Sequence, residues 1–153
     1  MKRIVSAFLA LAVSAILVFV ATSWKHRVTV VHAQGGGCTD ATLRGNYAFS
    51  QPGWSPLVRG QGAQLPFFNV GVLAFGGTGT FSVSLTGVFH GVVSSETDAG
   101  TYTVNRDCTG SLSLTTGPSA GLTFNMVIVG GGAEAFAINT TEGFTSSVDA
   151  KKQ

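Results

Sequence analysis

The chain has 153 residues, a formal net charge of +2 and only 10% charged residues. Four of its nine basic residues precede residue 34, and the remainder carries five basic against seven acidic side chains, a net charge of −2. Domains that bind nucleic acid need a basic patch, so this balance excludes a nucleic-acid partner. Residues 34–153 are long enough for one domain of about 100–150 residues.

The N-terminal segment is typical of a secretory signal. Lys2 and Arg3 precede an uncharged, largely apolar run over 4–20, which is the charged-then-apolar order of such signals. We predict that residues 1–33 form a signal helix with its leader, cleaved after Ala33 or earlier after Ser23, and that the protein is secreted or periplasmic.

The alternative is that this segment is kept as a membrane anchor. Its apolar run reaches the lower limit for crossing a bilayer, about 17 residues. An uncleaved segment would hold the rest of the chain at the membrane, facing outside the cytoplasm, and would be the chain's contact with lipid.

The rest of the chain predicts short β-strands. Gly, Thr, Ser, Val and Phe are frequent, and apolar and polar residues alternate, as in FSVSLT at 81–86. The predicted strands cover 43–50, 67–75, 81–86, 88–93, 101–105, 110–115, 122–129, 133–140 and 144–148.

Three segments are predicted as connections. Residues 51–64 hold two prolines and three glycines and indicate a loop, GGTG at 76–79 indicates a hairpin turn, and SSETDAG at 94–100 indicates a polar turn. Because nearly every connection is this short, neighbouring strands should be antiparallel.

The predicted fold is all-β, an antiparallel up-and-down barrel of about eight strands over residues 43–150, with 34–42 as a preceding tail that carries Cys38. Closure into a barrel is favoured because it removes the two exposed edges of a meander. A two-sheet sandwich is the alternative.

The two cysteines predict a disulfide. Cys38 precedes the first strand and Cys108 lies at a turn, and an oxidising compartment favours their pairing. Closing a loop of about 70 residues would stabilise the fold by roughly 4 kcal/mol on the chain-entropy argument. A reactive thiol and a metal site are the alternatives, but no histidine or cysteine cluster at ligand spacing supports either.

Several segments resemble a group of short exported bacterial proteins of uncharacterised function. They are Cys38, LRGNYAFS at 43–50, FFNVGVLAFGGTG at 67–79 and GTYTVNRDCTG at 100–110. The layout is also similar to calycin-like and allene-oxide-cyclase-like barrels. The resemblance implies a fold and carries no activity across.

Candidate binding residues are aromatic or can donate a hydrogen bond. An eight-stranded barrel has an interior that side chains fill or that holds one small ligand. We predict Trp54 in a loop at the barrel mouth, and polar contacts from Tyr47, Tyr102 and His90, the one histidine after residue 33. The predicted ligand-binding residues are Tyr47, Trp54, Phe67, Phe81, His90, Tyr102 and Phe124.

Three functions remain open. The favoured one is a secreted, non-catalytic protein that binds a small apolar ligand or a cell-surface partner. The second is a structural envelope or matrix protein that works through its loops or edges. The third is a cyclase or isomerase in a similar barrel, in which His90 would pair with Glu134 or Asp107. No catalytic residue, cofactor or metal is predicted.

Overall fold

The computed structural model describes residues 37–58 and 61–153. The predicted signal helix and its anchor alternative lie outside these residues. A short 3-10 helix, η1 (Asp40–Thr42), precedes eight strands. The strands are β1 (Arg44–Val58), β2 (Gln61–Gly76), β3 (Thr80–Phe89), β4 (Val92–Val104), β5 (Thr109–Thr116), β6 (Thr123–Val129), β7 (Glu134–Asn139) and β8 (Thr145–Lys152).

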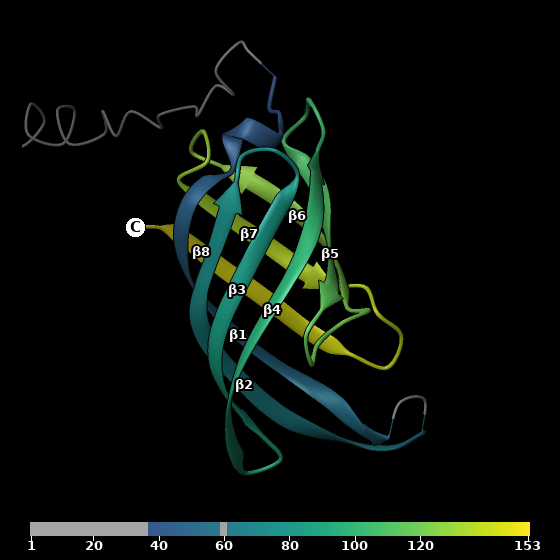
Figure 1. Ribbon diagram of the computed structural model, residues 1–153. Helices are drawn as coiled ribbons and strands as arrows, with labels where there is room; N and C mark the ends of the chain where they lie inside the picture. Colours follow the sequence, from purple (N-terminus) through teal and green to yellow (C-terminus); the bar gives the residue numbers. More distant parts are fainter. Residues whose placement is uncertain (1–36, 59–60) are drawn as a thin grey trace, which may run out of the picture. The chain divides into compact units, whose positions relative to one another are not determined.

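The strands form one closed antiparallel barrel in chain order (Figure 1). Each strand pairs with the next, and β8 returns to pair with β1 from Tyr47 opposite Lys152 to Trp54 opposite Thr145. The predicted all-β up-and-down barrel is therefore confirmed, and the two-sheet alternative is wrong.

Alternation in the sequence explains which side chains fill the barrel. In β3, Phe81, Val83 and Leu85 are buried while the two serines between them are exposed. β6 repeats the pattern with Phe124 and Met126. Successive side chains of a strand point to opposite faces, so one face of each strand becomes core.

Residues 51–64 form a long hairpin rather than the predicted loop. β1 continues to Val58 and β2 begins at Gln61, and Trp54 stands directly opposite Pro66. The prediction was wrong because proline and glycine were taken to end the strand. Figure 1 shows this hairpin extending from one end of the barrel together with the β3–β4 hairpin.

Two of the three prolines in this hairpin, Pro56 and Pro66, lie where their strand has a single neighbour. The third, Pro52, lies between Ser50 and Gly53, which both pair with β8, at a point where the β1–β8 ladder has no pair. β8 pairs with β1 only as far as Trp54, so Pro56 lies beyond it. β3 pairs with β2 only from Phe67 onward, so Pro66 also lies outside that ladder. Proline has no N–H to donate, and at such positions no second strand requires one.

Residues 94–100 belong to β4 and are not the predicted polar turn. The chain reverses earlier, at His90 and Gly91, whose φ angles are 51° and 85°. Phe89 and Val92 flank this two-residue turn as a pair. Positive φ at both central residues is what a tight hairpin turn requires, and glycine adopts it readily.

The N-terminal segment closes one end of the barrel. The predicted disulfide is confirmed: Cys38 is bonded to Cys108, in the turn between β4 and β5. The backbone N–H of Val104 donates to Asp40 Oδ1 at 2.7 Å. Leu43, which follows η1, is fully buried inside the barrel.

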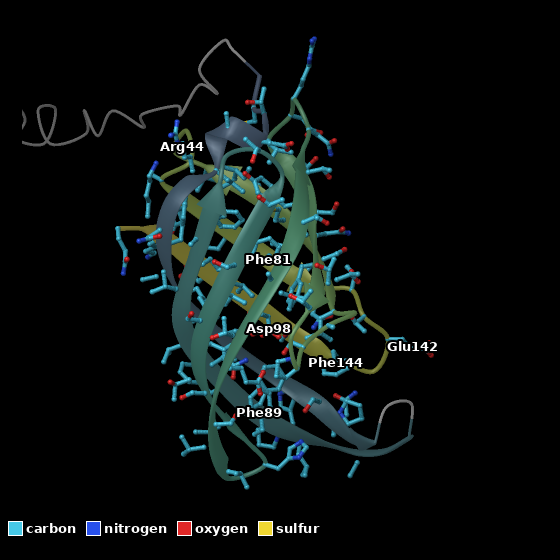
Figure 2. The ribbon with its side chains drawn as sticks, viewed as in Figure 1. Arg44, Phe81, Phe89, Asp98, Glu142 and Phe144 are labelled. Atoms are coloured by element: carbon cyan, nitrogen blue, oxygen red, sulfur yellow. A yellow bond between two sulfur atoms is a disulfide. The ribbon has the colours of Figure 1, made fainter. Side chains whose placement is uncertain are left out.

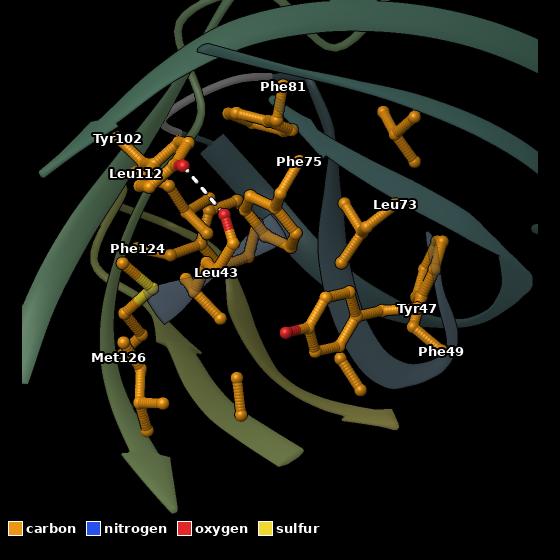
Figure 3. Close-up of a cluster of buried hydrophobic side chains, with 14 of the residues drawn as sticks. Leu43, Tyr47, Phe49, Leu73, Phe75, Phe81, Tyr102, Leu112, Phe124 and Met126 are labelled. Atoms are coloured by element: carbon orange, nitrogen blue, oxygen red, sulfur yellow. Dashed lines mark hydrogen bonds between the residues drawn. The ribbon is translucent and has the colours of Figure 1, made fainter. Parts of the chain in front are cut away.

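An aromatic cluster lies beneath this closed end (Figure 3). Tyr47 and Tyr102 each meet the Phe75 ring edge-on, with centroids 5.3 and 5.0 Å apart. The Tyr102 hydroxyl lies 2.9 Å from the carbonyl oxygens of both Asp40 and Leu43. We call these four residues, Leu43, Tyr47, Phe75 and Tyr102, the aromatic plug.

Candidate functional site

A cavity of about 250 Å³ lies inside the barrel, next to the aromatic plug. Most of its lining is carbon. Six phenylalanines line it, together with leucine, valine, methionine, alanine and proline side chains and a few polar ones. The six are Phe49, Phe67, Phe81, Phe89, Phe124 and Phe144.

The cavity reaches solvent at the end opposite η1. This end, the mouth, is formed by the β1–β2 and β3–β4 hairpins and by the loops at 117–122 and 140–144. Phe89 and Phe144 line the cavity there and are partly exposed, and Pro118 is exposed. In Figure 2, Phe89 and Phe144 lie nearer the mouth than Phe81.

A glycine makes room for the aromatic rings near the mouth. Phe67 and Phe89 stack with centroids 5.5 Å apart and planes 14° apart. A Cβ on Gly53 would come within 2.5 Å of both the Phe67 ring and the Ser146 side chain. Glycine at this position of β1 therefore allows the Phe67 ring to lie across the strand.

Three polar side chains form a buried chain of hydrogen bonds beside the rings. Asn69 Nδ2 donates to Gln51 Oε1 at 3.0 Å, and Gln51 Nε2 donates to Ser146 Oγ at 3.1 Å. Gln51 and Asn69 line the cavity. Asn69 Oδ1 is buried and has no hydrogen-bond partner among the described residues.

Two carboxylates of β4 lie on the inward face and hold the 117–122 loop. Glu96 lines the cavity, and its Oε2 accepts from the Ser119 hydroxyl at 3.3 Å. Asp98 is 2% exposed, and its Oδ1 accepts from the Ser119 backbone N–H at 2.9 Å. Asp98 Oδ2 has no partner in the described part of the chain.

His90 is exposed in the β3–β4 turn and does not line the cavity. Its Nε2 lies 3.3 Å from the hydroxyl of Ser55, which does line it. The acid–base pairing considered for an enzyme is not formed, because Asp107, in the β4–β5 turn, and Glu134, the first residue of β7, lie at the end of the barrel opposite His90. Glu134 instead forms an ion pair with Lys151 at 3.2 Å.

Of the predicted binding residues, Phe67, Phe81 and Phe124 lie in the cavity wall. The contacts predicted for Tyr47 and Tyr102 fall outside it, because both hydroxyls are used in the closed end. Tyr47 donates to the carbonyl oxygen of Gly132, and Tyr102 donates to the segment around η1.

Trp54 lies in β1, not in a loop, and its side chain is 50% exposed on the outside of the barrel. The physical reason is register. Gly53 and Ser55 face inward, so the residue between them must face out. Leu57, in the same predicted loop, is outside the residues whose side chains are described.

Sequence reasoning missed the polar residues of the cavity wall. Gln51 and Asn69 stand opposite each other in the β1–β2 ladder, but Gln51 fell within the predicted loop and Asn69 is a single polar residue in an apolar strand. Glu96 fell within the predicted turn. Continuing the alternation from Tyr47 and Phe49 to Gln51 was the available signal.

Burial perturbs the acidity of the two tyrosines in the plug. Desolvation raises the pKa of the Tyr47 hydroxyl above its ordinary value, and the neighbouring Tyr102 adds to this effect. Desolvation likewise raises the pKa of Tyr102. Both hydroxyls are therefore neutral donors over the physiological pH range.

Residues 37–58 and 61–153 contain no group of three or more His, Cys, Asp or Glu side chains placed to hold a metal ion. Over the same residues, no helix has the length and apolar character needed to span a bilayer.

Comparison of the chain with protein-family models, with curated proteins and with solved structures finds no match. The resemblance to short exported bacterial proteins therefore stays a prediction.

Proposed function

We propose that this protein is an exported, non-catalytic carrier that binds one small apolar ligand inside its barrel. The observation that carries the proposal is the phenylalanine-lined cavity of about 250 Å³. An apolar cavity of roughly 150 Å³ is enough to hold a benzene molecule in a protein core. This cavity is larger, so a ligand with one aromatic ring and a short side arm suits it.

The closed end supports the proposal because the contacts that close the barrel lie at the end away from the mouth. The plug, η1 and the Cys38–Cys108 bond stabilise one end of the barrel. The mouth lies at the other end, so a ligand could enter without disturbing them.

Filling the cavity tests the proposal. Ala137 lines the cavity from β7, and an Ala137→Phe side chain would occupy space that the ligand needs. The matched control is Ala48→Phe, at an exposed position of β1. Native mass spectrometry and titration with 2-phenylethanol should show a loss of about tenfold or more in affinity for Ala137→Phe alone. Equal binding by both variants would contradict the proposal.

Export is supported by the signal-like N-terminus and by the disulfide, since such bonds persist in oxidising compartments. The mass of the protein recovered outside the cytoplasm tests it. A mature chain that begins at Gln34 or Trp24 fits cleavage. Recovery of the full-length chain with membranes would favour the anchor instead.

Self-association is a second candidate, favoured by a free strand edge near the mouth. β4 pairs with β5 only from Ala99 onward, so in the described residues Val92 to Ser95 have a strand neighbour on one side alone. Val92 and Val93 are each 68% exposed. A second copy of the chain could pair along this edge, as unprotected edges tend to do.

Light scattering over a concentration series tests this candidate. A charged residue on an edge opposes pairing, so Val93→Lys should abolish a dimer that Val127→Lys, on the outside of β6, leaves intact. A wild-type protein that stays monomeric throughout the series rules the candidate out.

A further inference from the structure

The polar atoms of the cavity wall indicate what the head group of a ligand must be. They lie among the phenylalanines on the mouth side of the barrel, on β1, β2, β4 and the 117–122 loop. The polar lining residues are Gln51, Ser55, Asn69, Glu96 and Ser119.

Asn69 offers a buried acceptor without a donor. Its side chain is 4% exposed, its amide nitrogen is engaged with Gln51, and its Oδ1 is unpaired in the described structure. A Cβ on Gly87 would collide with this oxygen, so the oxygen occupies interior space that a side chain of β3 would otherwise fill. A buried carbonyl oxygen without a hydrogen bond is unfavourable, and a donor from a ligand would relieve this.

The charge of the cavity wall also favours a ligand that donates a hydrogen bond. Glu96 is the one acidic side chain that lines the cavity, and Asp98 lies two residues further along the inward face of β4, buried with one unpaired oxygen. None of the described arginines and lysines lines the cavity. Lys151 pairs with Glu134, and Lys152 lies over the outside of the plug, 6.0 Å from the Tyr47 ring centroid.

We propose that the cavity selects a ligand with an apolar body and a hydrogen-bond-donating head, an alcohol or an amine, and excludes carboxylates. The inference rests on the proposed carrier function. A hydroxyl can donate to Asn69 Oδ1, and an ammonium group is also attracted by Glu96 and by the faces of the phenylalanine rings. A carboxylate would lose its hydration beside Glu96 with no cation to compensate.

Four small probes of matched shape test the proposal on the wild-type protein. They are ethylbenzene, 2-phenylethanol, 2-phenylethylamine and phenylacetate, titrated at neutral pH by calorimetry. We expect the alcohol and the amine to bind about tenfold tighter than phenylacetate, and the alcohol to bind tighter than ethylbenzene. This ranking needs no variant, so a misfolded mutant cannot obscure it.

Two substitutions separate the contributions of the amide and the charge. Asn69→Leu should remove the preference for the alcohol over ethylbenzene while ethylbenzene still binds. Glu96→Gln should remove the preference for the amine over the alcohol and improve phenylacetate. The controls are Asn125→Leu on the outside of β6 and Glu142→Gln in the β7–β8 loop, where Figure 2 shows Glu142 pointing away from the barrel.

The outcomes distinguish this inference from the carrier function. If phenylacetate binds the wild-type protein as tightly as the alcohol, the inference is overturned and the carrier function stands. If none of the four probes binds, ethylbenzene included, the carrier function itself is overturned. Loss of the alcohol preference in Asn125→Leu as well as Asn69→Leu would show that Asn69 does not select the head group.

Discussion

Two hydroxyl groups connect the barrel wall to its closed end. Tyr102 reaches the carbonyl oxygens of Asp40 and Leu43, and Tyr47 reaches that of Gly132. The alternating pattern predicts that both tyrosines face the core. It does not predict their partners, because Gly132 lies 85 residues from Tyr47 and becomes its neighbour only when β7 and β8 complete the ring.

Removal of the Tyr102 hydroxyl should destabilise the protein. Tyr102→Phe keeps the ring that packs on Phe75 but removes the hydroxyl that donates to the buried carbonyl oxygen of Leu43. Leaving a buried acceptor without its donor costs about 1–3 kcal/mol. Urea unfolding should show this loss. Thr101→Val, which removes an exposed hydroxyl from the same strand, should change the free energy of unfolding by less than about 0.5 kcal/mol. Equal effects of the two variants would contradict the role of the Tyr102 hydrogen bonds.

The same hydroxyls should make the protein sensitive to alkali. Their pKa values are raised in the folded state by desolvation, so folding favours the protonated form. The resulting stability is fully present below the ordinary tyrosine pKa of about 10 and is lost as the pH rises through the raised folded value.

The alkaline effect can be measured on these groups alone, since the chain has two tyrosines. Ultraviolet absorbance of tyrosinate should titrate above pH 10 in the folded protein and near pH 10 after unfolding. The free energy of unfolding should fall more steeply above pH 10 in the wild type than in the Tyr47→Phe, Tyr102→Phe double variant. Identical slopes would rule out this linkage.

At the scale of elements, the hairpins at the mouth show where sequence patterns mislead. Prolines and glycines in 51–64 and polar residues in 94–100 are typical of loops, yet both segments are strand. Pro56 lies beyond the β1–β8 ladder, Pro52 lies at a point where that ladder has no pair, and Glu96 of β4 faces a cavity rather than a packed core. Composition does not reveal which proline positions lack a partner on the second neighbouring strand, or which polar side chains face a cavity. Both depend on how the neighbouring strands are placed.

Gly53 should resist substitution even though its backbone needs no positive φ. A Cβ at this position of β1 meets the Phe67 ring at 2.5 Å, so Gly53→Ala must displace a ring that lines the cavity. Overpacking of this kind costs about 1–3 kcal/mol. Chemical denaturation checks it, with Ala48→Val on the exposed face of the same strand as the control. A Gly53→Ala protein as stable as the control would mean that the ring moves without cost.

At the scale of the whole molecule, the barrel and its disulfide could be predicted and the cavity could not. Short connections, alternation and the disadvantage of free edges all favour a closed meander. Whether such a barrel is full or hollow depends on how its inward side chains meet. Here a Cβ on Gly53, Gly71 or Gly87 would collide with atoms of a neighbouring strand, so these glycines let those atoms extend into the barrel. No pattern in the sequence predicts the volume of the cavity that is left.

The two ends of the barrel should therefore respond separately to mutation. The disulfide closes a loop with a sequence separation of 70 residues at the plugged end, and its loss should lower the free energy of unfolding by about 2–5 kcal/mol. The cavity opens at the other end and none of its lining residues is a cysteine. A Cys38→Ala, Cys108→Ala variant that is still folded should therefore bind 2-phenylethanol almost as tightly as the wild type.

Urea unfolding and calorimetry on the same preparations test this separation. The expected pair of results is a clear loss of stability with an affinity changed by less than about twofold, below 0.5 kcal/mol of binding free energy. A parallel loss of affinity in the folded variant would show instead that the plug controls the shape of the cavity. In that event the phenylalanine wall and the closed end act as one unit, because the Phe81 ring that lines the cavity also packs against Phe75 in the plug.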